Sequence, residues 1–360
     1  MSWLPDRVVD HLRIVADLPD LSATRYRLVR KVAQGGMGSV YEAHDSLLDR
    51  PIALKVLSIA DASGELAARM LREARVVARL EHPAIVPIHD VGTLQDGRVF
   101  YAMKLVQGKR LDEHKKTSPP IPDLLRVFQR VCEAVAFAHV HGVIHRDLKP
   151  ENIMVGAFGE ILVMDWGLAK ILDPDKFNTD SDEASVDPAR ATGRSPLLQN
   201  FSPDRHETLH GAIMGTPLYM APEQALGETD RIDQRTDVYA LGAILQFLLS
   251  RDAGSSRSHA PGESGFPFAL SRARARHSRI PKALAAICAK ARAAEQGQRY
   301  DSASDLAADI ERFVNGLAVS SFKENPGERV WRWLIKYRFM VVLILTYLVA
   351  RILLFFWFRP

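Results

Sequence analysis

The order in which strand-like and helix-like segments occur is the feature that most constrains the fold of this chain. Apolar and polar residues alternate as in half-buried strands at 26–60 and 98–106, and a short apolar run follows at 161–164. Helices are expected at 64–80, 122–141, 281–295 and 301–315. Residues 236–250 are apolar on all sides, which predicts a helix at the centre of the core. Strands that come early and helices that come late predict an α+β protein with a small sheet lobe and a large helical lobe.

Composition excludes several classes of protein. Of the 360 residues, 47% are apolar and 25% are charged, so the chain can bury a sizeable core and is not a disordered polymer. The two cysteines, Cys132 and Cys288, lie far apart and outside any CxxC pair. This excludes a disulfide-rich scaffold and a cysteine zinc site, and it indicates a reducing compartment. The net charge of +4 is too small to predict a nucleic-acid partner.

A cluster of glycines separates two strand-like runs in the segment AlaGlnGlyGlyMetGlySerVal at 33–40. Gly35 and Gly38 let the backbone approach phosphate oxygens closely and present N–H groups to them. No Lys-Ser/Thr pair follows, which excludes a Walker loop, and the next element is a strand, which excludes a dinucleotide-binding turn. A plain β-hairpin explains this segment equally well.

A lysine and a glutamate form a candidate ion pair. Lys55 lies in the strand PIALKVL, where a solvated edge-strand lysine is the simpler interpretation. In the helix at 64–80, however, Glu73 falls inside the apolar stripe, where an unpaired carboxylate is costly. A buried glutamate needs a cation, so we expect Lys55 to supply it.

The most specific motif is HisArgAspLeuLysProGluAsn at 145–152, which is followed by AspTrpGly after a short buried strand. The motif contains a carboxylate, Asp147, a cation two residues later, Lys149, and an amide, Asn152. Asn152 and Asp165 offer the hard oxygen ligands that Mg²⁺ prefers. Asp147 then remains to face an attacking hydroxyl.

Together these segments resemble the signature of the protein kinases, which continues with an APE segment, here Ala221-Pro222-Glu223. The resemblance covers about residues 26–315. It is strongest to the membrane-anchored bacterial serine/threonine kinases, which share GGMGxVY, HRDLKPEN and GTPxYMAPEQ. It implies the bilobal protein-kinase fold, with a β-rich N-lobe at 26–104, a helical C-lobe at 105–315 and an extended activation segment at 165–223.

The resemblance implies roles for the residues of the specific motif. Asp147 would orient and deprotonate a substrate hydroxyl, and Lys149 would contact the transferring phosphate. Asn152 and Asp165 would bind Mg²⁺ or Mn²⁺. The LKPEN pattern and Thr216 in GTPLY are similar to those of kinases that act on serine and threonine hydroxyls of proteins.

The resemblance also implies an ATP site. Lys55, held by Glu73, would contact the α- and β-phosphates, and Met103 would lie at the back of the adenine pocket. The backbone of 104–106 would hydrogen-bond the base. The implied nucleotide contacts are Val32, Ala33, Gln34, Gly35, Gly36, Met37, Gly38, Ser39, Val40, Ala53, Lys55, Met103, Lys104 and Val106.

Two further contacts and two departures follow from the same resemblance. Glu223 is expected to pair with Arg299, and Asp237 is expected to accept backbone N–H groups of the catalytic loop. Ala33 replaces the first glycine of the usual loop, which predicts modestly weaker nucleotide binding. Trp166 replaces the usual phenylalanine after the metal-binding aspartate, which predicts a change in packing rather than a loss of activity.

Two other functions remain as alternatives. A pseudokinase scaffold is disfavoured because the lysine, the glutamate, both aspartates and the asparagine of the signature are all present. A small-molecule phosphotransferase of related fold is disfavoured by Arg146, Thr216 and the APE segment, which serve a protein-substrate site and its control.

The activation segment is unusually long, with the excess in a polar loop at 173–212. Such a loop beside Arg146 predicts a phosphorylation switch, because a phosphate adds about two negative charges and pairs with arginine. Thr208 is the first candidate, and Thr192 and Ser195 are weaker ones. A homodimer, in which one copy phosphorylates the other, would be a further partner.

The two ends of the chain differ. Residues 1–25 form an N-terminal extension with charges that exclude a signal peptide, and a short amphipathic helix is possible at 7–18. Residues 339–358 are apolar except for Arg351, which predicts a transmembrane helix in a lipid bilayer, with a buried C-terminal helix as the alternative. The basic, tryptophan-containing linker at 316–338 would place the kinase domain in the cytoplasm, anchored to the cell membrane by a single span.

Overall fold

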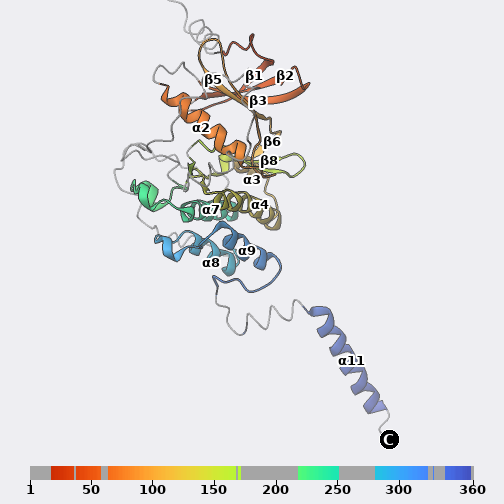
Figure 1. The fold of residues 1–360 in the computed structure, drawn as a ribbon. Coiled ribbons are helices and arrows are strands. Elements are labelled where there is room, and N and C mark those ends of the chain that lie inside the picture. The colour runs from red at the N-terminus through yellow and green to blue at the C-terminus, as the bar shows by residue number, and fades with distance from the viewer. Residues whose placement is uncertain are drawn as a thin grey trace, which may run out of the picture.

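A computed structural model describes residues 18–35, 38–57, 64–167, 169–171, 218–250, 280–322, 327 and 337–357. These residues form a sheet lobe and a helical lobe, and one further helix lies apart from both (Figure 1). The expected two-lobed α+β fold is confirmed. The possible helix at 7–18 and the polar loop at 173–212 lie outside the described residues.

The sheet lobe is a single antiparallel sheet with the strand order β1-β2-β3-β5-β4 and one helix packed on it. Its elements are β1 (Tyr26–Gln34), β2 (Gly38–Asp45), β3 (Arg50–Leu57), α2 (Glu65–Arg79), β4 (Ile88–Thr93) and β5 (Val99–Lys104). Alternation of side chains gives the sheet two apolar faces. Tyr41, Leu54 and Phe100 pack on one face, and Leu57 and Tyr101 pack on the other with Met70 of α2.

The chain packs on the sheet lobe before β1 begins. Leu21 is 7% exposed and joins the cluster of Tyr41 and Phe100. Arg98, which is also buried, donates to the carbonyl oxygen of Leu18 at 3.1 Å.

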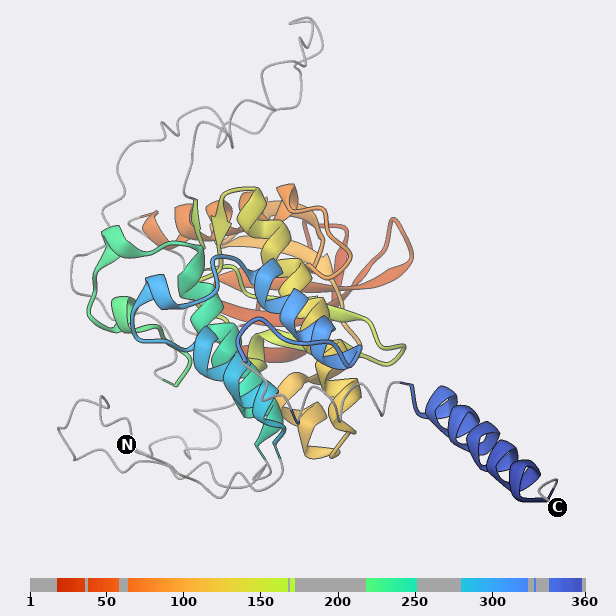
Figure 2. The same cartoon turned by 90° about the horizontal axis from the view of Figure 1, so that it is seen from below.

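The helical lobe is built around α4 and α7 and carries two small sheets (Figures 1 and 2). Its helices are α3 (Leu111–Lys116), α4 (Ile121–Val140), η1 (Pro150–Asn152), α6 (Pro222–Ala225), η5 (Thr229–Arg231), α7 (Gln234–Leu249), α8 (Lys282–Ala291), η6 (Gln296–Gln298) and α9 (Ala303–Val314). Its strands are β6 (Gly108–Arg110), β7 (Val143–Ile144), β8 (Ile153–Gly156), β9 (Ile161–Val163) and β10 (Lys170–Ile171).

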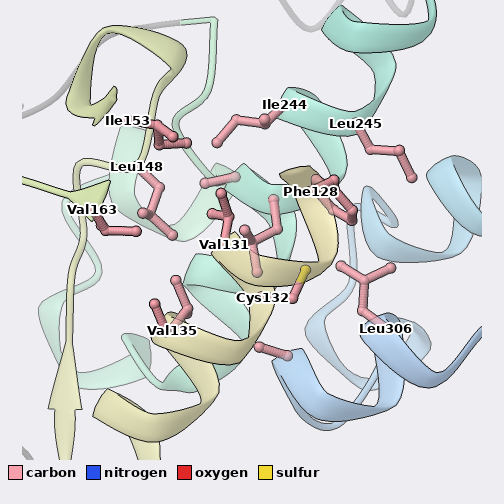
Figure 3. Packing of buried hydrophobic residues seen from close by; sticks show 14 of the residues in the cluster. Phe128, Val131, Cys132, Val135, Leu148, Ile153, Val163, Ile244, Leu245 and Leu306 are labelled. Atoms are coloured by element: carbon pink, nitrogen blue, oxygen red, sulfur yellow. The ribbon is translucent and has the colours of Figure 1, made fainter. Parts of the chain in front are cut away.

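The core of this lobe lies between α4, α7 and α9 (Figure 3). Phe128 and Val131 of α4, Ile244 of α7 and Leu306 of α9 are all fully buried there. The expected helix at 236–250 is therefore central, as its apolar character on all sides predicts. Burial of the loop residue Leu148 in the same cluster fixes the catalytic segment against the core.

One helix ends earlier than the sequence predicts. The helix expected at 281–295 ends at Ala291, and the carbonyl oxygens of Ala293 and Ala294 instead accept hydrogen bonds from Arg299, at 2.8 and 3.1 Å. The buried guanidinium of Arg299 needs hydrogen-bond acceptors, and these two carbonyl oxygens supply them in place of continued helical hydrogen bonding.

After α9 the chain turns back across the lobe. Gly316 has a φ of +65°, in the left-handed region that suits glycine after a helix. Val319 is then buried in the core at 5% exposure. The fully buried Asp309 of α9 accepts hydrogen bonds from Ser320 and Tyr300, among others. We call residues 319–322 the C-terminal strap.

The last helix, α11 (Arg338–Trp357), exposes its apolar side chains. Phe339 is 77% exposed, Leu343 70% and Trp357 84%. Within the part of the chain that the structure describes, no helix is both long and apolar enough to traverse a lipid bilayer. The transmembrane helix expected at 339–358 is therefore not shown by the structure.

Candidate active site

Residues 145–152 form the expected catalytic loop, and a buried carboxylate of α7 holds its backbone. Asp237 is 1% exposed and accepts the N–H groups of His145 and Arg146 at 2.8 and 2.9 Å. Arg146 has a φ of +68°, a strained value for a residue with a side chain. These hydrogen bonds are the contact expected of Asp237, and they stabilise the strained turn immediately before Asp147.

His139 supports the same carboxylate, although its sequence position suggests only packing. Its Nε2 lies 2.8 Å from Asp237 Oδ2, and both side chains are buried. The residues are 98 positions apart, so no local pattern predicts the pair. The only signal in the sequence is a histidine at the end of an apolar helix face, close before the catalytic loop.

The structure brings together Asp147, Lys149 and Asn152. Lys149 Nζ lies 2.7 Å from Asp147 Oδ2, and Asn152 Nδ2 donates to the Asp147 carbonyl oxygen at 2.8 Å. The donor bond fixes the amide of Asn152 and leaves its Oδ1 as the atom that can ligate a cation. A carboxylate thus lies beside an ammonium group, which suits charge neutralisation during phosphoryl transfer.

We call residues 165–167, where a metal ion is expected to bind, the metal loop. Asp165 has strained backbone, with a φ of +59°. Its carboxylate is 47% exposed, and Oδ1 lies 3.4 Å from Lys55 Nζ. Burial by itself raises the pKa of Asp165, but the charge of Lys55, its hydrogen bond to Asp165 and the other nearby positive charges together outweigh burial and hold this pKa below its ordinary value. Asp165 is therefore an ionised oxygen donor, and with Asn152 Oδ1 it fits Mg²⁺ or Mn²⁺.

Trp166 lies beneath this loop and is 1% exposed. Its ring centroid is 4.5 Å from that of His145, and its Nε1 donates to the carbonyl oxygen of Val163 at 3.4 Å. His145 in turn donates from Nε2 to the carbonyl oxygen of Met164 at 3.0 Å. The two carbonyl groups before Asp165 are therefore both held by ring N–H groups.

The structure places Lys55 and Glu73 in contact. Lys55 Nζ lies 2.7 Å from Glu73 Oε1, and the side chains are 13% and 2% exposed. Burial lowers the pKa of Lys55, but the neighbouring Tyr101 oxygen and the carboxylates of Glu73 and Asp165 outweigh burial and raise this pKa above its ordinary value. The charged lysine links α2, β3 and the metal loop across the two lobes.

Several residues implied to contact nucleotide share one face of the sheet. In the register of β2, β3 and β5, Val40 lies opposite Lys55, and Ala53 lies opposite Met103. Residues two apart on a strand point to the same side, so Val40, Ala53 and Met103 share a face of the sheet with Lys55. Ala53 is buried, and Met103 and Val106 are half-buried.

The glycine loop is only partly described, because Gly36 and Met37 lie outside the described residues. A Cβ on Gly38 would lie 2.3 Å from the carbonyl oxygen of Val56, whereas one on Gly35 would lie 3.7 Å from the nearest atom. Close packing against β3 thus requires glycine at Gly38. The other implied contacts there are exposed at Val32, Ala33 and Gln34 and buried at Ser39.

Lys104 is the implied contact whose side chain lies elsewhere. It alternates with Met103 on β5 and is exposed. Together with Leu80 and His82 it lines a separate cavity of about 510 Å³ at the end of α2. Lys104 can therefore contact the nucleotide base only through its backbone, as the resemblance implies for residues 104–106.

The APE segment is anchored as expected. Arg299 Nη1 and Nη2 each lie 2.8 Å from an oxygen of Glu223, and both side chains are buried. The next residue, Gln224, donates to the carbonyl oxygen of Arg146 at 2.8 Å. This short helix therefore connects the end of the activation segment to the catalytic loop.

Comparison with known proteins agrees with this geometry. The family model described as "Protein kinase domain" matches residues 26–263. A serine/threonine-protein kinase PknD of Protochlamydia amoebophila is 34% identical over 313 residues, which cover 81% of this chain and 30% of that protein. The PknD of Chlamydia muridarum is 35% identical over 315 residues, which cover 81% of this chain and 32% of that protein.

The chain thus spans about a third of the length of these curated relatives. Among solved structures, the Mycobacterium tuberculosis PknI kinase domain matches with a TM-score of 0.54 and 26% identity, covering 82% of this chain and 97% of that domain. The resemblance stated from the motifs is confirmed, and the chain belongs to the protein kinase domain family.

Proposed function

We propose that this protein is a serine/threonine protein kinase, which transfers the γ-phosphoryl group of ATP to hydroxyl groups of protein substrates. The observation that carries the proposal is the continuous set of contacts from Glu73 through Lys55 to Asp165, beside the joined group of Asp147 and Lys149. A kinase needs these charges positioned together, because phosphoryl transfer is catalysed mainly by positioning and charge neutralisation.

Each residue of the site has a defined task in this reaction. Asp147 accepts the proton of the serine or threonine hydroxyl and directs that oxygen at the phosphorus atom. Lys149, 2.7 Å from Asp147, neutralises charge on the transferring group. Lys55 would hold the non-transferred phosphates, and Asn152 and Asp165 would hold Mg²⁺, which when bound would neutralise charge on the phosphate oxygens.

Transfer of labelled phosphate from ATP in the presence of Mg²⁺ tests the proposal. We expect the full chain to label itself or a general acceptor protein. Asp147→Asn and Lys55→Met should each lower the rate by at least about a hundredfold, as for loss of a catalytic acid–base group or charge. Equal labelling by all three proteins would refute the proposal, and ATP binding without transfer by the wild type would favour the pseudokinase alternative.

We propose further that the activation segment is controlled by phosphorylation. Arg146 is half-buried, and burial lowers its pKa despite the nearby Asp237. Its Nε has no hydrogen-bond partner among the described residues, and the charges of Arg69 and Lys170 act on the same region. A phosphate on Thr208, Thr192 or Ser195 would supply the missing anion. Absence of phosphate throughout 173–216 after incubation with ATP, measured by mass spectrometry, would contradict this.

We also propose that residues 339–358 attach the protein to a membrane, with the kinase domain in the cytoplasm. Support comes from the exposed apolar side chains of α11, which water solvates poorly, and from the basic linker before it. Sedimentation of the full chain with vesicles, compared with a chain ending at residue 322, tests this. Equal recovery of both chains in the supernatant would contradict it.

A further inference from the structure

Tyr101 of β5, which the motifs do not include, lies against the Lys55–Glu73 pair. Its hydroxyl donates to Glu73 Oε1 at 2.7 Å, and the same oxygen accepts the bond from Lys55 Nζ. Tyr101 is 4% exposed. Glu73 Oε2 is buried and has no hydrogen-bond partner among the described residues. Both hydrogen bonds that fix the carboxylate therefore end on one oxygen.

The strand register explains how Tyr101 reaches this position. Tyr101 lies directly opposite Lys55 in the pairing of β3 with β5, so both side chains project from the same face of the sheet. Helix α2 packs on that face, and its residues Met70 and Ala74 share a buried cluster with Tyr101. The aromatic ring thus contacts the helix that carries Glu73, and the hydroxyl bonds to Glu73 itself.

The chemistry of the group suits a hydrogen-bond donor. Burial raises the pKa of Tyr101 above its ordinary value of 10.0, and the adjacent Glu73 carboxylate raises it further, although Lys55 opposes this. The hydroxyl therefore keeps its proton at neutral pH. A hydrogen bond from a neutral donor to a buried carboxylate is among the stronger ones in proteins.

We propose that Tyr101 is a positioning residue for phosphoryl transfer, which fixes the Glu73 carboxylate and α2 so that Lys55 is presented to the nucleotide. The assignment rests on the kinase function proposed above. Without the hydroxyl, Lys55 is the only remaining hydrogen-bond partner of Glu73 within the described part of the chain. The carboxylate then keeps one hydrogen bond in place of two, and the link from Glu73 of α2 to β5 through the Tyr101 hydroxyl is lost.

The variant Tyr101→Phe tests this, because it keeps the ring and removes only the donor. We expect kcat to fall about tenfold, because one charge-assisted hydrogen bond that aligns Glu73 is lost. KM for ATP should change less than about threefold. The matched control is Tyr26→Phe. Tyr26 donates to Asp90 at 2.6 Å on the opposite face of the same sheet, and its variant should retain kcat within about twofold.

Two further measurements separate positioning from simple support of the fold. In a Glu73→Ala background the additional change Tyr101→Phe should cost no further activity, because the acceptor that the Tyr101 hydroxyl acts through is gone. In the nucleotide-free protein, hydrogen exchange in α2 (Glu65–Arg79) should be faster for Tyr101→Phe than for Tyr26→Phe.

The assignment is wrong if Tyr101→Phe matches Tyr26→Phe in both kcat and α2 exchange, or if the full cost of Tyr101→Phe in kcat persists in the Glu73→Ala background. If Tyr101→Phe does not fold, Tyr101→Met replaces it, because methionine fills similar space without a hydroxyl. Tyr101→Met must then show faster exchange in α2 and a lower kcat than Tyr26→Phe. If the wild type transfers no phosphate, the proposed function fails, and the exchange comparison alone then supports or overturns the role of Tyr101.

Discussion

Trp166 donates its indole N–H to the carbonyl oxygen of Val163, 3.4 Å away and three residues earlier in the segment that leads to Asp165. The residue that follows Asp165 is thereby bonded to the strand that precedes Asp165. The Trp166 ring also contacts the His145 ring, with 4.5 Å between centroids and 47° between the ring planes, so two contacts hold the loop. A phenylalanine at this position provides stacking but no donor.

Trp166→Phe should therefore loosen the metal loop without abolishing transfer. We expect about 1 kcal/mol lower stability from the lost buried hydrogen bond. Some ATP-site inhibitors require residue 166 to leave its buried position. They should bind the variant at least about threefold more tightly, because the conformation with residue 166 buried has lost a hydrogen bond and competes less well with inhibitor binding. Inhibitors that leave residue 166 in place serve as the control. Equal affinities of both proteins for both inhibitor classes would contradict this account.

Gly38→Ala should destabilise the sheet lobe even in the absence of nucleotide. The new Cβ would lie 2.3 Å from the Val56 carbonyl oxygen, so β2 and β3 must separate, at a cost of about 1–3 kcal/mol. Gly35→Ala has room for its Cβ and is the matched control. Thermal unfolding without ATP measures the difference. A similar melting temperature for both variants would show that packing against β3 does not require this glycine.

Arg299→Lys should destabilise the helical lobe strongly. Lysine keeps the charge but cannot make two parallel bonds to Glu223, and the buried carboxylate loses a partner that is 0% exposed. Removing one member of a buried pair costs about 3–5 kcal/mol, and we expect lysine to recover only part of this. Arg126→Lys, at an exposed pair with Asp123, should change stability little. Unfolding by urea measures both.

Asp309 should make the stability of the helical lobe sensitive to acid. Burial raises the pKa of Asp309, but hydrogen bonds from Ser320, Arg312 and Tyr300 outweigh burial and hold this pKa well below its ordinary value of 3.8. A depressed folded-state pKa stabilises the protein above the unfolded-state pKa, and this contribution is lost as the pH falls through the folded-state value.

The melting temperature of Asp309→Asn should accordingly lie below that of the wild type by a constant amount above about pH 5, and the gap should narrow below about pH 4. Asp301→Asn, at an exposed carboxylate, is the control and should show no such convergence. A gap that stays constant down to pH 3 would contradict the assigned direction.

The sequence predicted those parts of the site in which local spacing carries the chemistry. Asp147, Lys149 and Asn152 lie within one short loop, so their proximity follows from chain geometry. Glu73 was recognisable because a carboxylate inside an apolar stripe requires a partner. The order of strands and helices likewise predicted the two lobes.

Contacts that depend on tertiary packing were not predictable in the same way. Tyr101 has the pattern of an ordinary buried strand residue, and only the β3–β5 register places its hydroxyl at Glu73. His139 is 98 residues from Asp237, and its helix pattern predicts only packing. The C-terminal strap has no periodicity, because single hydrogen bonds to Asp309 hold it rather than a repeating face.

The attachment of this strap determines where a mechanical load would enter the protein. Val319 is embedded in the core, and Ser320 and Ser321 are bonded to Asp309 of α9, which itself packs against α4. Tension drawn along the chain from α11 is therefore borne by α9 and α4. None of these contacts involves the sheet lobe, so such a load would enter the protein through the helical lobe.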